Sequence, residues 1–226
     1  MTSDEFSVAR ERMVREQVFS RGVTDRGVLR ALLTTPRHKF LDSSAGAEAY
    51  TDHALPIGFS QTMSQPYMVG YLAEELRLIG TESVLEVGTG SGYQAAVLSV
   101  LAQRVYTIER IPELAKKAED VFGAIGIRSI FTRVGDGSRG WPEMAPYDRI
   151  LLTAAAEGLP EQLIEQLSDG GFLLGPVVGN NGKQEIIRLA RQGSRYEVER
   201  LANCTFVPLV RSTSADRPTL GGAESR

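Results

Sequence analysis

The sequence predicts an α/β protein with a doubly wound, mostly parallel sheet, an antiparallel edge and an N-terminal helical segment. Two observations support this fold class. A short apolar run at residues 84–87 leads directly into Gly88, Gly90 and Gly92, and apolar residues then recur at helical spacing. Apolar runs and helical patterns go on alternating along the chain, as they do in successive βαβ units. We expect residues 1–60 to pack as a helical segment on a core of residues 61–210.

The N-terminal segment is predicted to form two helices. Residues 5–19 carry a single apolar stripe among charged residues, made by Met13, Val14 and Val18. Gly22 is suited to end this helix, and Thr24 or Asp25 to cap a second one that Pro36 stops.

Ser64 is the candidate functional residue of the next segment. It precedes Pro66 and a helical pattern, so it stands where a helix N-cap is expected, with proline in the first turn. A hydroxyl beside free amides and the positive end of a helix also suits a carboxylate ligand. Local physics leaves both roles open, a cap or a carboxylate site.

The strands after the glycine turn each end in a candidate ligand-binding position. Residues 105–109 form a predicted strand ending in Glu109, about 20 residues past the glycines, the spacing that places a carboxylate on a ribose diol. Residues 129–134 form the next strand, followed by Asp136 and Gly137. Further strands are expected at 148–153 and 172–178, with a helix between them from Pro160, and two antiparallel strands at 184–190 and 203–209. Residues 211–226 are polar, and we expect them to be disordered.

Composition limits the classes of function. The chain has 226 residues, enough for one well-packed domain, and a formal net charge of −3, which gives no reason to expect a nucleic-acid partner. Its single cysteine excludes an internal disulfide, and with only two histidines we expect no zinc site. The first twelve residues show no apolar signal-peptide core and no stretch is long enough for a membrane span, so we expect a cytoplasmic protein, with a monomer as the default.

The glycine turn distinguishes between nucleotide cofactors. Its pattern is E-x-G-x-G-x-G, starting at Glu86, and not the G-x-G-x-x-G of dinucleotide-binding proteins. The pattern resembles motif I of Rossmann-like S-adenosylmethionine methyltransferases. A tight turn without a ligand is the alternative, and the acids on the following strands argue against it.

Other segments narrow the resemblance to one family. Ala-Leu-Pro-Ile-Gly at 54–58, Gln-Thr-Met-Ser-Gln-Pro at 61–66, the glycine turn, Gly-Asp-Gly at 135–137 and Phe-Val-Pro-Leu at 206–209 resemble the protein-L-isoaspartate O-methyltransferases. The resemblance runs in order from about residue 10 to residue 210. It implies S-adenosyl-L-methionine as cofactor and isoaspartyl-containing proteins and peptides as substrates. It also implies Ser64 as the catalytic residue and the following cofactor-binding residues: Gln61, Thr62, Met63, Glu86, Gly88, Gly90, Gly92, Glu109, Arg110, Asp136 and Gly137.

The implied reaction explains why no histidine or cysteine constellation is visible. The α-carboxylate that an isoaspartyl residue exposes has a pKa of about 3.5, so it is ionised at neutral pH and needs no general base. Ser64 would then orient this carboxylate and attack nothing. Two alternatives remain at this stage: a related carboxyl methyltransferase dedicated to one peptide or protein partner, and a binding protein of the same fold that has lost turnover.

Overall fold

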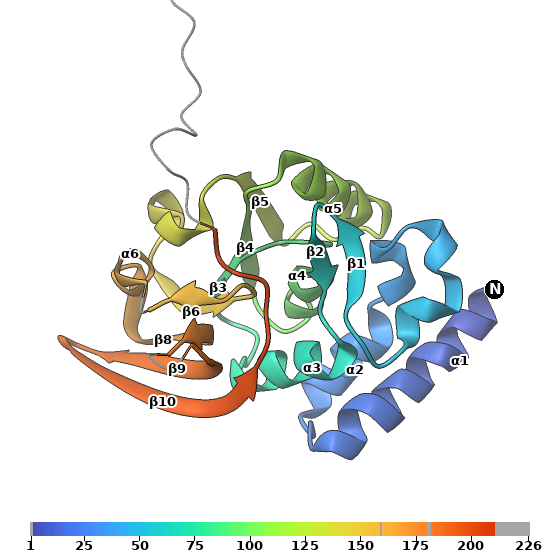
Figure 1. Cartoon of the computed structure of the whole chain (residues 1–226), viewed down its shortest axis with the longest axis horizontal. Coiled ribbons are helices and arrows are strands. Elements are labelled where there is room, and N and C mark those ends of the chain that lie inside the picture. The colour runs from blue at the N-terminus through green and yellow to red at the C-terminus, as the bar shows by residue number, and fades with distance from the viewer. Residues whose placement is uncertain (1, 159, 180–181, 211–226) are drawn as a thin grey trace, which may run out of the picture.

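The computed structural model describes residues 2–158, 160–179 and 182–210 (Figure 1). The expected disorder of residues 211–226 falls outside this part of the chain. Within it, a single large sheet has the strand order β10-β9-β8-β6-β3-β4-β5, with the short β7 pairing β8. The strands are β3 (Ser83–Val87), β4 (Arg104–Glu109), β5 (Ile130–Val134), β6 (Tyr147–Leu152), β7 (Ala156–Glu157), β8 (Leu167–Val178), β9 (Gln184–Gln192) and β10 (Arg195–Cys204).

The sheet is parallel from β5 across to β8, and antiparallel where β8 pairs β9 and β9 pairs β10. This confirms the predicted mostly parallel sheet with an antiparallel edge. From β3 the chain adds β4 and β5 on one side, then returns to place β6 on the other side of β3. The strand order therefore reverses between β3 and β6, and a ligand of such a sheet binds outside the carboxyl ends of the strands at that point.

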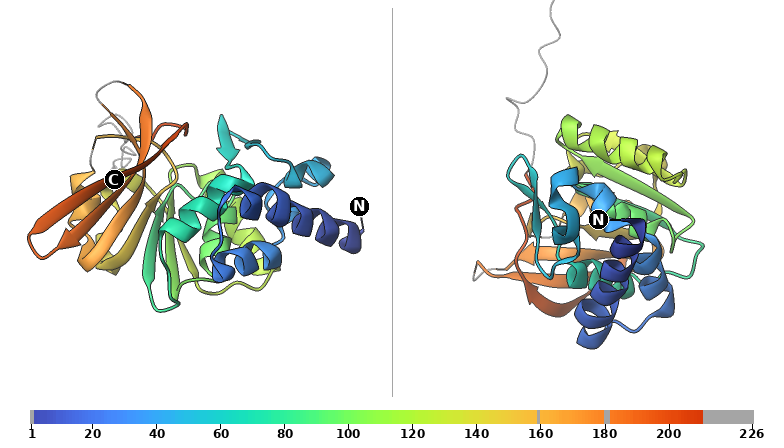
Figure 2. Two further views of the ribbon diagram at one scale, coloured as in Figure 1. Left: turned by 90° about the horizontal axis from the view of Figure 1, so that it is seen from below. Right: turned by 90° about the vertical axis from the view of Figure 1, so that its right-hand side faces the viewer.

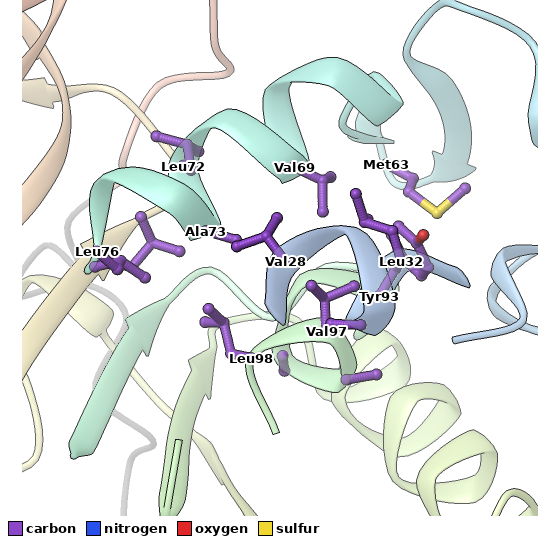
Figure 3. Close-up of a cluster of buried hydrophobic side chains, with 14 of the residues drawn as sticks. Val28, Leu32, Met63, Val69, Leu72, Ala73, Leu76, Tyr93, Val97 and Leu98 are labelled. Atoms are coloured by element: carbon purple, nitrogen blue, oxygen red, sulfur yellow. The ribbon is translucent and has the colours of Figure 1, made fainter. Parts of the chain in front are cut away.

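Three helices cover one face of the sheet, and two N-terminal helices pack on the outside of them. The covering helices are α3 (Pro66–Glu75), α4 (Tyr93–Leu98) and α5 (Pro112–Ala124), and the outer ones are α1 (Ser3–Met13) and α2 (Arg26–Thr34). Leu32 of α2, Leu72 of α3 and Leu98 of α4 are all fully or almost fully buried in one apolar cluster, which Figure 3 shows from the side. The N-terminal helices thus share a core with the sheet, and the boundary near residue 60 stays a prediction.

The N-terminal helices begin and end as their sequences suggest. Asp25 caps α2 by accepting a hydrogen bond from the amide of Val28. After α1 the chain continues through a π-helical turn (Val14–Val18) and a 3₁₀ turn (Phe19–Arg21), and Gly22 ends the run in a left-handed conformation with φ of 100°. In Figure 2 these helices lie at one end of the molecule and the antiparallel strands at the other.

The second face carries little helix. Two 3₁₀ turns, Gly137–Arg139 and Pro142–Met144, precede β6, and the only α-helix among the described residues after β6 is the four-residue α6 (Glu161–Ile164). The helix predicted from Pro160 is therefore shorter than its apolar pattern, because Leu167 already pairs with Tyr147 as the first residue of β8.

The last strand differs from the prediction. We expected residues 203–209, whereas β10 covers Arg195–Cys204. This is an exposed edge strand whose outer residues are mostly polar, so no apolar run marks it. The apolar residues after it leave the sheet edge and return over the end of β6, where Ala155 and Pro208 form an isolated parallel bridge (Figure 1).

A small hairpin of β1 (Leu55–Gly58) and β2 (Gln61–Met63) stands apart from the large sheet. Two 3₁₀ stretches, Arg37–Phe40 and Ser43–Tyr50, connect it to α2. None of the helices among the described residues is long and apolar enough to cross a membrane.

Candidate functional site

A cavity lies at the carboxyl ends of β3 and β4, at the point where the strand order reverses. Its lining comes from segments far apart in the sequence: residues 61–64, 87–91, 108–111, 153–154 and 207–210, together with Val69, Tyr93, Gln94 and Gly137. Of the residues implied by the sequence, the structure brings Gln61, Thr62, Met63, Ser64, Gly88, Gly90, Glu109, Arg110 and Gly137 to this lining.

The glycine turn presents backbone to the cavity because side chains have no room there. Gly88 has φ of 103°, and a Cβ atom on it would lie 2.3 Å from Oγ1 of Thr153. The Thr153 hydroxyl stands within hydrogen-bond reach of the carbonyls of Val87 and Gly88, at 2.9 and 2.6 Å, and so ties the turn to the end of β6. Gly90, with φ of 55°, leaves its side of the turn open to a ligand.

Glu109 faces the glycine turn from the end of β4. One carboxylate oxygen accepts a hydrogen bond from the amide of Gly90 at 2.9 Å, and the other accepts from the amide of Ile111 at 3.0 Å. A carboxylate has about four lone-pair positions, so each oxygen can accept one further bond. Two vicinal hydroxyls of a ribose fit this remaining capacity.

Glu86 does not line the cavity. It is fully buried in β3, where one oxygen accepts a hydrogen bond from the hydroxyl of Thr107 at 2.5 Å. The Thr107 hydroxyl lies 2.7 Å from that of Thr89 in the glycine turn. Burial raises the pKa of Glu86 to about 8, against the opposing effect of the Thr107 hydrogen bond. The structure therefore places Glu86 beneath the turn, as a support reached through two threonines.

Gly92 and Asp136 are also absent from the cavity lining. Gly92 ends the turn with φ of 87°, and a Cβ atom there would lie 2.7 Å from the ring of Phe122, so this glycine allows α5 to pack closely. Asp136 accepts hydrogen bonds from the amide and hydroxyl of Ser138, at 3.0 and 2.7 Å, and begins a 3₁₀ turn.

Ser64 is not the helix cap that its position suggested. The N-cap of α3 is Gln65, one residue later, and no side chain caps the helix. Of the two roles that the sequence left open, the structure does not show the cap, because Pro66 occupies the first helical position and leaves Ser64 outside the first turn. In the described part of the chain, the Ser64 hydroxyl has no hydrogen-bond partner, while its carbonyl accepts from Arg37 at 2.7 Å.

A second hollow meets the cavity at Ser64. It is lined by residues 52–54 and 205–207 with Gln65 and Met68, and it shares Thr62, Ser64, Thr153 and Val207 with the cavity. This hollow forms a groove beside the cavity, and the two therefore meet around these four shared residues.

Two parts of the lining were not among the site residues named from the sequence. Thr153 stands at the end of the predicted strand 148–153, an end expected to face the ligand, and it follows β6. Residues 207–210 arrive from beyond β10, held by hydrogen bonds between Ala155 and both Val207 and Leu209. The only signal for the second part was the Phe-Val-Pro-Leu stretch at 206–209, which gives no indication of where it folds.

The reversed strand order, the glycine turn and the acid at the end of β4 define the class: a Rossmann-like fold with a site for a ribose-containing cofactor, as in the S-adenosylmethionine-dependent methyltransferases that the glycine pattern resembles. A sequence model of the protein-L-isoaspartate(D-aspartate) O-methyltransferases matches residues 9–214. The chain belongs to this family.

Individual relatives agree with this assignment. The chain is 49% identical over 207 residues to a protein-L-isoaspartate O-methyltransferase of Geobacter metallireducens, covering 91% of this chain and 95% of that protein. It is 50% identical over 190 residues to a protein-L-isoaspartate O-methyltransferase of Maricaulis maris, covering 84% of this chain and 89% of that protein.

Solved structures show the same fold. A protein-L-isoaspartate O-methyltransferase at 27% identity superposes with a TM-score of 0.81, over 88% of this chain and 65% of that one. A Plasmodium falciparum protein of the same description, in complex with S-adenosyl-L-homocysteine, gives a TM-score of 0.79 at 20% identity, over 90% of this chain and 99% of that one.

Proposed function

We propose that this chain transfers a methyl group from S-adenosylmethionine to the free α-carboxylate of L-isoaspartyl residues in damaged proteins and peptides. One observation carries the proposal beyond family membership. The cavity over the glycine turn and the neighbouring groove meet at Ser64, whose hydroxyl is not used to cap a helix.

The residues of the cavity fit the cofactor. Glu109 has acceptor capacity for a ribose diol beside the glycine turn, and Gly88 and Gly90 let the backbone approach a ligand closely. Gly137 lies in the same lining, packed against Val87, where a Cβ atom would come within 2.5 Å of the valine side chain. When bound, S-adenosylmethionine supplies a methyl group on a positively charged sulfur, which is a good leaving group.

The chain has no proton to move in this reaction. The substrate carboxylate is already ionised at neutral pH, since its pKa is about 3.5. The task of the protein is therefore to hold the carboxylate in line and to exclude water from it. Ser64 can donate its hydroxyl proton in a hydrogen bond to that carboxylate without transferring it. The resulting methyl ester would close to a succinimide, which allows partial return to normal aspartate.

The surroundings of the enzyme are also part of the proposal. A net charge of −3, a single cysteine and the absence of any expected nucleic-acid motif support a cytoplasmic enzyme that acts on polypeptides and not on nucleic acids or membranes. A monomer is the proposed oligomeric state.

Methyl transfer from labelled S-adenosylmethionine to paired peptides tests the proposal. The two peptides share one sequence and differ only in an aspartyl or an isoaspartyl linkage. We expect label on the isoaspartyl peptide alone. Equal labelling of both peptides, or labelling of neither beside transfer to a single protein partner, would contradict it.

A further inference from the structure

Arg37 is a buried cation that the reaction does not explain. It has no exposed surface and is the largest of the fully buried side chains. Burial lowers the pKa of its guanidinium to about 10, so it stays charged at neutral pH. In the described part of the chain no carboxylate forms an ion pair with Arg37. A buried charge without such a partner is costly, and an apolar side chain of similar size would avoid that cost.

The hydrogen bonds of Arg37 join separate parts of the molecule. Its Nε donates to the carbonyl of Ala49 at 2.8 Å, and one terminal nitrogen donates to the carbonyl of Ser64 at 2.7 Å. The guanidinium also lies over the ring of Tyr93, 4.8 Å from its centroid. Tyr93 is the first residue of α4, immediately after the glycine turn. Arg37 therefore connects the N-terminal segment, the Ser64 segment and the turn that holds the cofactor.

The hydrogen bond from Arg37 restrains Ser64, a residue that regular secondary structure does not hold in place. Ser64 lies between the end of β2 at Met63 and the cap of α3 at Gln65, so neither the ladder nor the helix includes it. A hydrogen bond from a charged donor is stronger than one between neutral groups. Because the peptide unit is planar, holding the carbonyl fixes the peptide plane that joins Ser64 to Gln65, and this restricts the backbone from which the Ser64 side chain projects.

We infer that Arg37 is a positioning residue for Ser64, holding its backbone so that the hydroxyl points to where the cavity and the groove meet. The inference rests on the proposed role of Ser64 toward the substrate carboxylate. Arg37 itself is buried and touches no substrate. Only arginine meets the geometry, since its planar fork reaches two carbonyls at once, whereas lysine presents a single compact charge.

Two variants of Arg37 distinguish the effect of its hydrogen bonds from the effect of its charge. Arg37→Met keeps an unbranched apolar stem but is shorter than arginine, has no donor and removes the buried charge, so the fold should tolerate it. Arg37→Lys keeps the charge and can reach one carbonyl. On an isoaspartyl peptide we expect kcat/KM to fall about tenfold in Arg37→Met and less in Arg37→Lys, the range typical of couplings between contacting residues. Affinity for S-adenosylhomocysteine, measured by calorimetry, should change far less.

A double-mutant cycle with Ser64→Ala shows whether Arg37 acts through Ser64. Once the hydroxyl is gone its position no longer matters, so Arg37→Met should lower kcat/KM by no more than about threefold in the Ser64→Ala background. Gln17→Ala is the matched control. It releases the carbonyl of Tyr50, next to Ala49, from a 2.8 Å hydrogen bond and touches nothing at Ser64. We expect it to lower the melting temperature and to leave kcat/KM per folded molecule unchanged.

The outcomes are distinct. Two outcomes would overturn the inference and leave the proposed function in place. In one, the fold-losses of kcat/KM in Arg37→Met and Ser64→Ala multiply in the double variant, and in the other, Arg37→Met keeps full kcat/KM. Failure of both Arg37 variants to fold would likewise make Arg37 purely structural. Full activity in Ser64→Ala would instead remove the role proposed for Ser64, and with it that of Arg37.

Discussion

Replacing Glu109 with glutamine tests the proposed cofactor site with a change of one atom. In the structure, the two carboxylate oxygens accept from the amides of Gly90 and Ile111. Glutamine keeps one acceptor oxygen and turns the other position into a donor. One of the two amides then loses its partner, at a cost of about 1–3 kcal/mol to the free energy of unfolding.

The effect on cofactor affinity follows from the same atoms. A hydrogen bond to a charged acceptor contributes about 1.5–3 kcal/mol and one between neutral groups about 0.5–1.5 kcal/mol. In the glutamine variant one diol hydroxyl donates to the amide oxygen and the other can only accept from the amide nitrogen, so each loses about 1 kcal/mol. Two hydroxyls give about 2 kcal/mol, or a dissociation constant raised about 30-fold. Calorimetric titration with S-adenosylhomocysteine measures this directly.

Glu113→Gln is the control for charge, because Glu113 lies exposed in the first turn of α5, four residues after Glu109. It changes the net charge by the same amount and should leave the dissociation constant unchanged. If Glu109→Gln also shifts the dissociation constant by less than about threefold, or if both variants shift it equally, Glu109 does not hold the ribose and the reasoning fails.

Three further predictions concern the residues around the turn. Ser64→Ala should lower kcat/KM on isoaspartyl peptide by about 10- to 100-fold, because it removes a hydrogen bond to a charged group. The melting temperature should change little, because no capping bond is lost. A lowered melting temperature with normal rates would contradict this prediction. Glu86 has its pKa raised by burial to about 8, so the unfolded chain ionises first, and stability present at low pH is lost as the pH rises from 4.5 to about 8. Glu86→Gln should flatten this dependence and be more stable at pH 8 by a few kcal/mol in denaturant unfolding; parallel pH profiles would refute it. Gly92→Ala should lower the free energy of unfolding by about 3 kcal/mol, because of the left-handed backbone and the contact with Phe122. In the control Gly126→Ala, where φ is 79° and nothing lies within 4 Å of the added Cβ atom, only the backbone contribution should be lost. Equal denaturation midpoints of the two variants would contradict the packing role of Gly92.

The sequence by itself determined the elements whose signals are local. The apolar run and glycines of residues 84–92 predict a strand, a turn and a helix, because a buried parallel strand is apolar throughout and the turn requires positive φ angles. The acid at the end of β4 was predicted at Glu109 from its distance along the chain, and it lies against the glycine turn. The spacing of these features also carries the resemblance that implied the class of cofactor.

Only the tertiary structure decided which residues reach the cavity. Glu86 and Gly92 belong to the same glycine pattern, yet one is buried beneath the turn and the other packs against α5. Residues 207–210 also line the cavity, although they follow the edge strand β10. No apolar run in the sequence marks that strand.

Arg37 shows the physical reason most clearly. In the sequence it stands between a proline and a histidine with nothing to mark it, 27 residues before Ser64. Its burial and its hydrogen bond to Ser64 arise because the N-terminal helices fold back onto the core that α3 and α4 share. Spacing along a chain constrains neighbours within one element, whereas burial and long-range hydrogen bonds depend on how elements pack, and that packing is set by the whole fold.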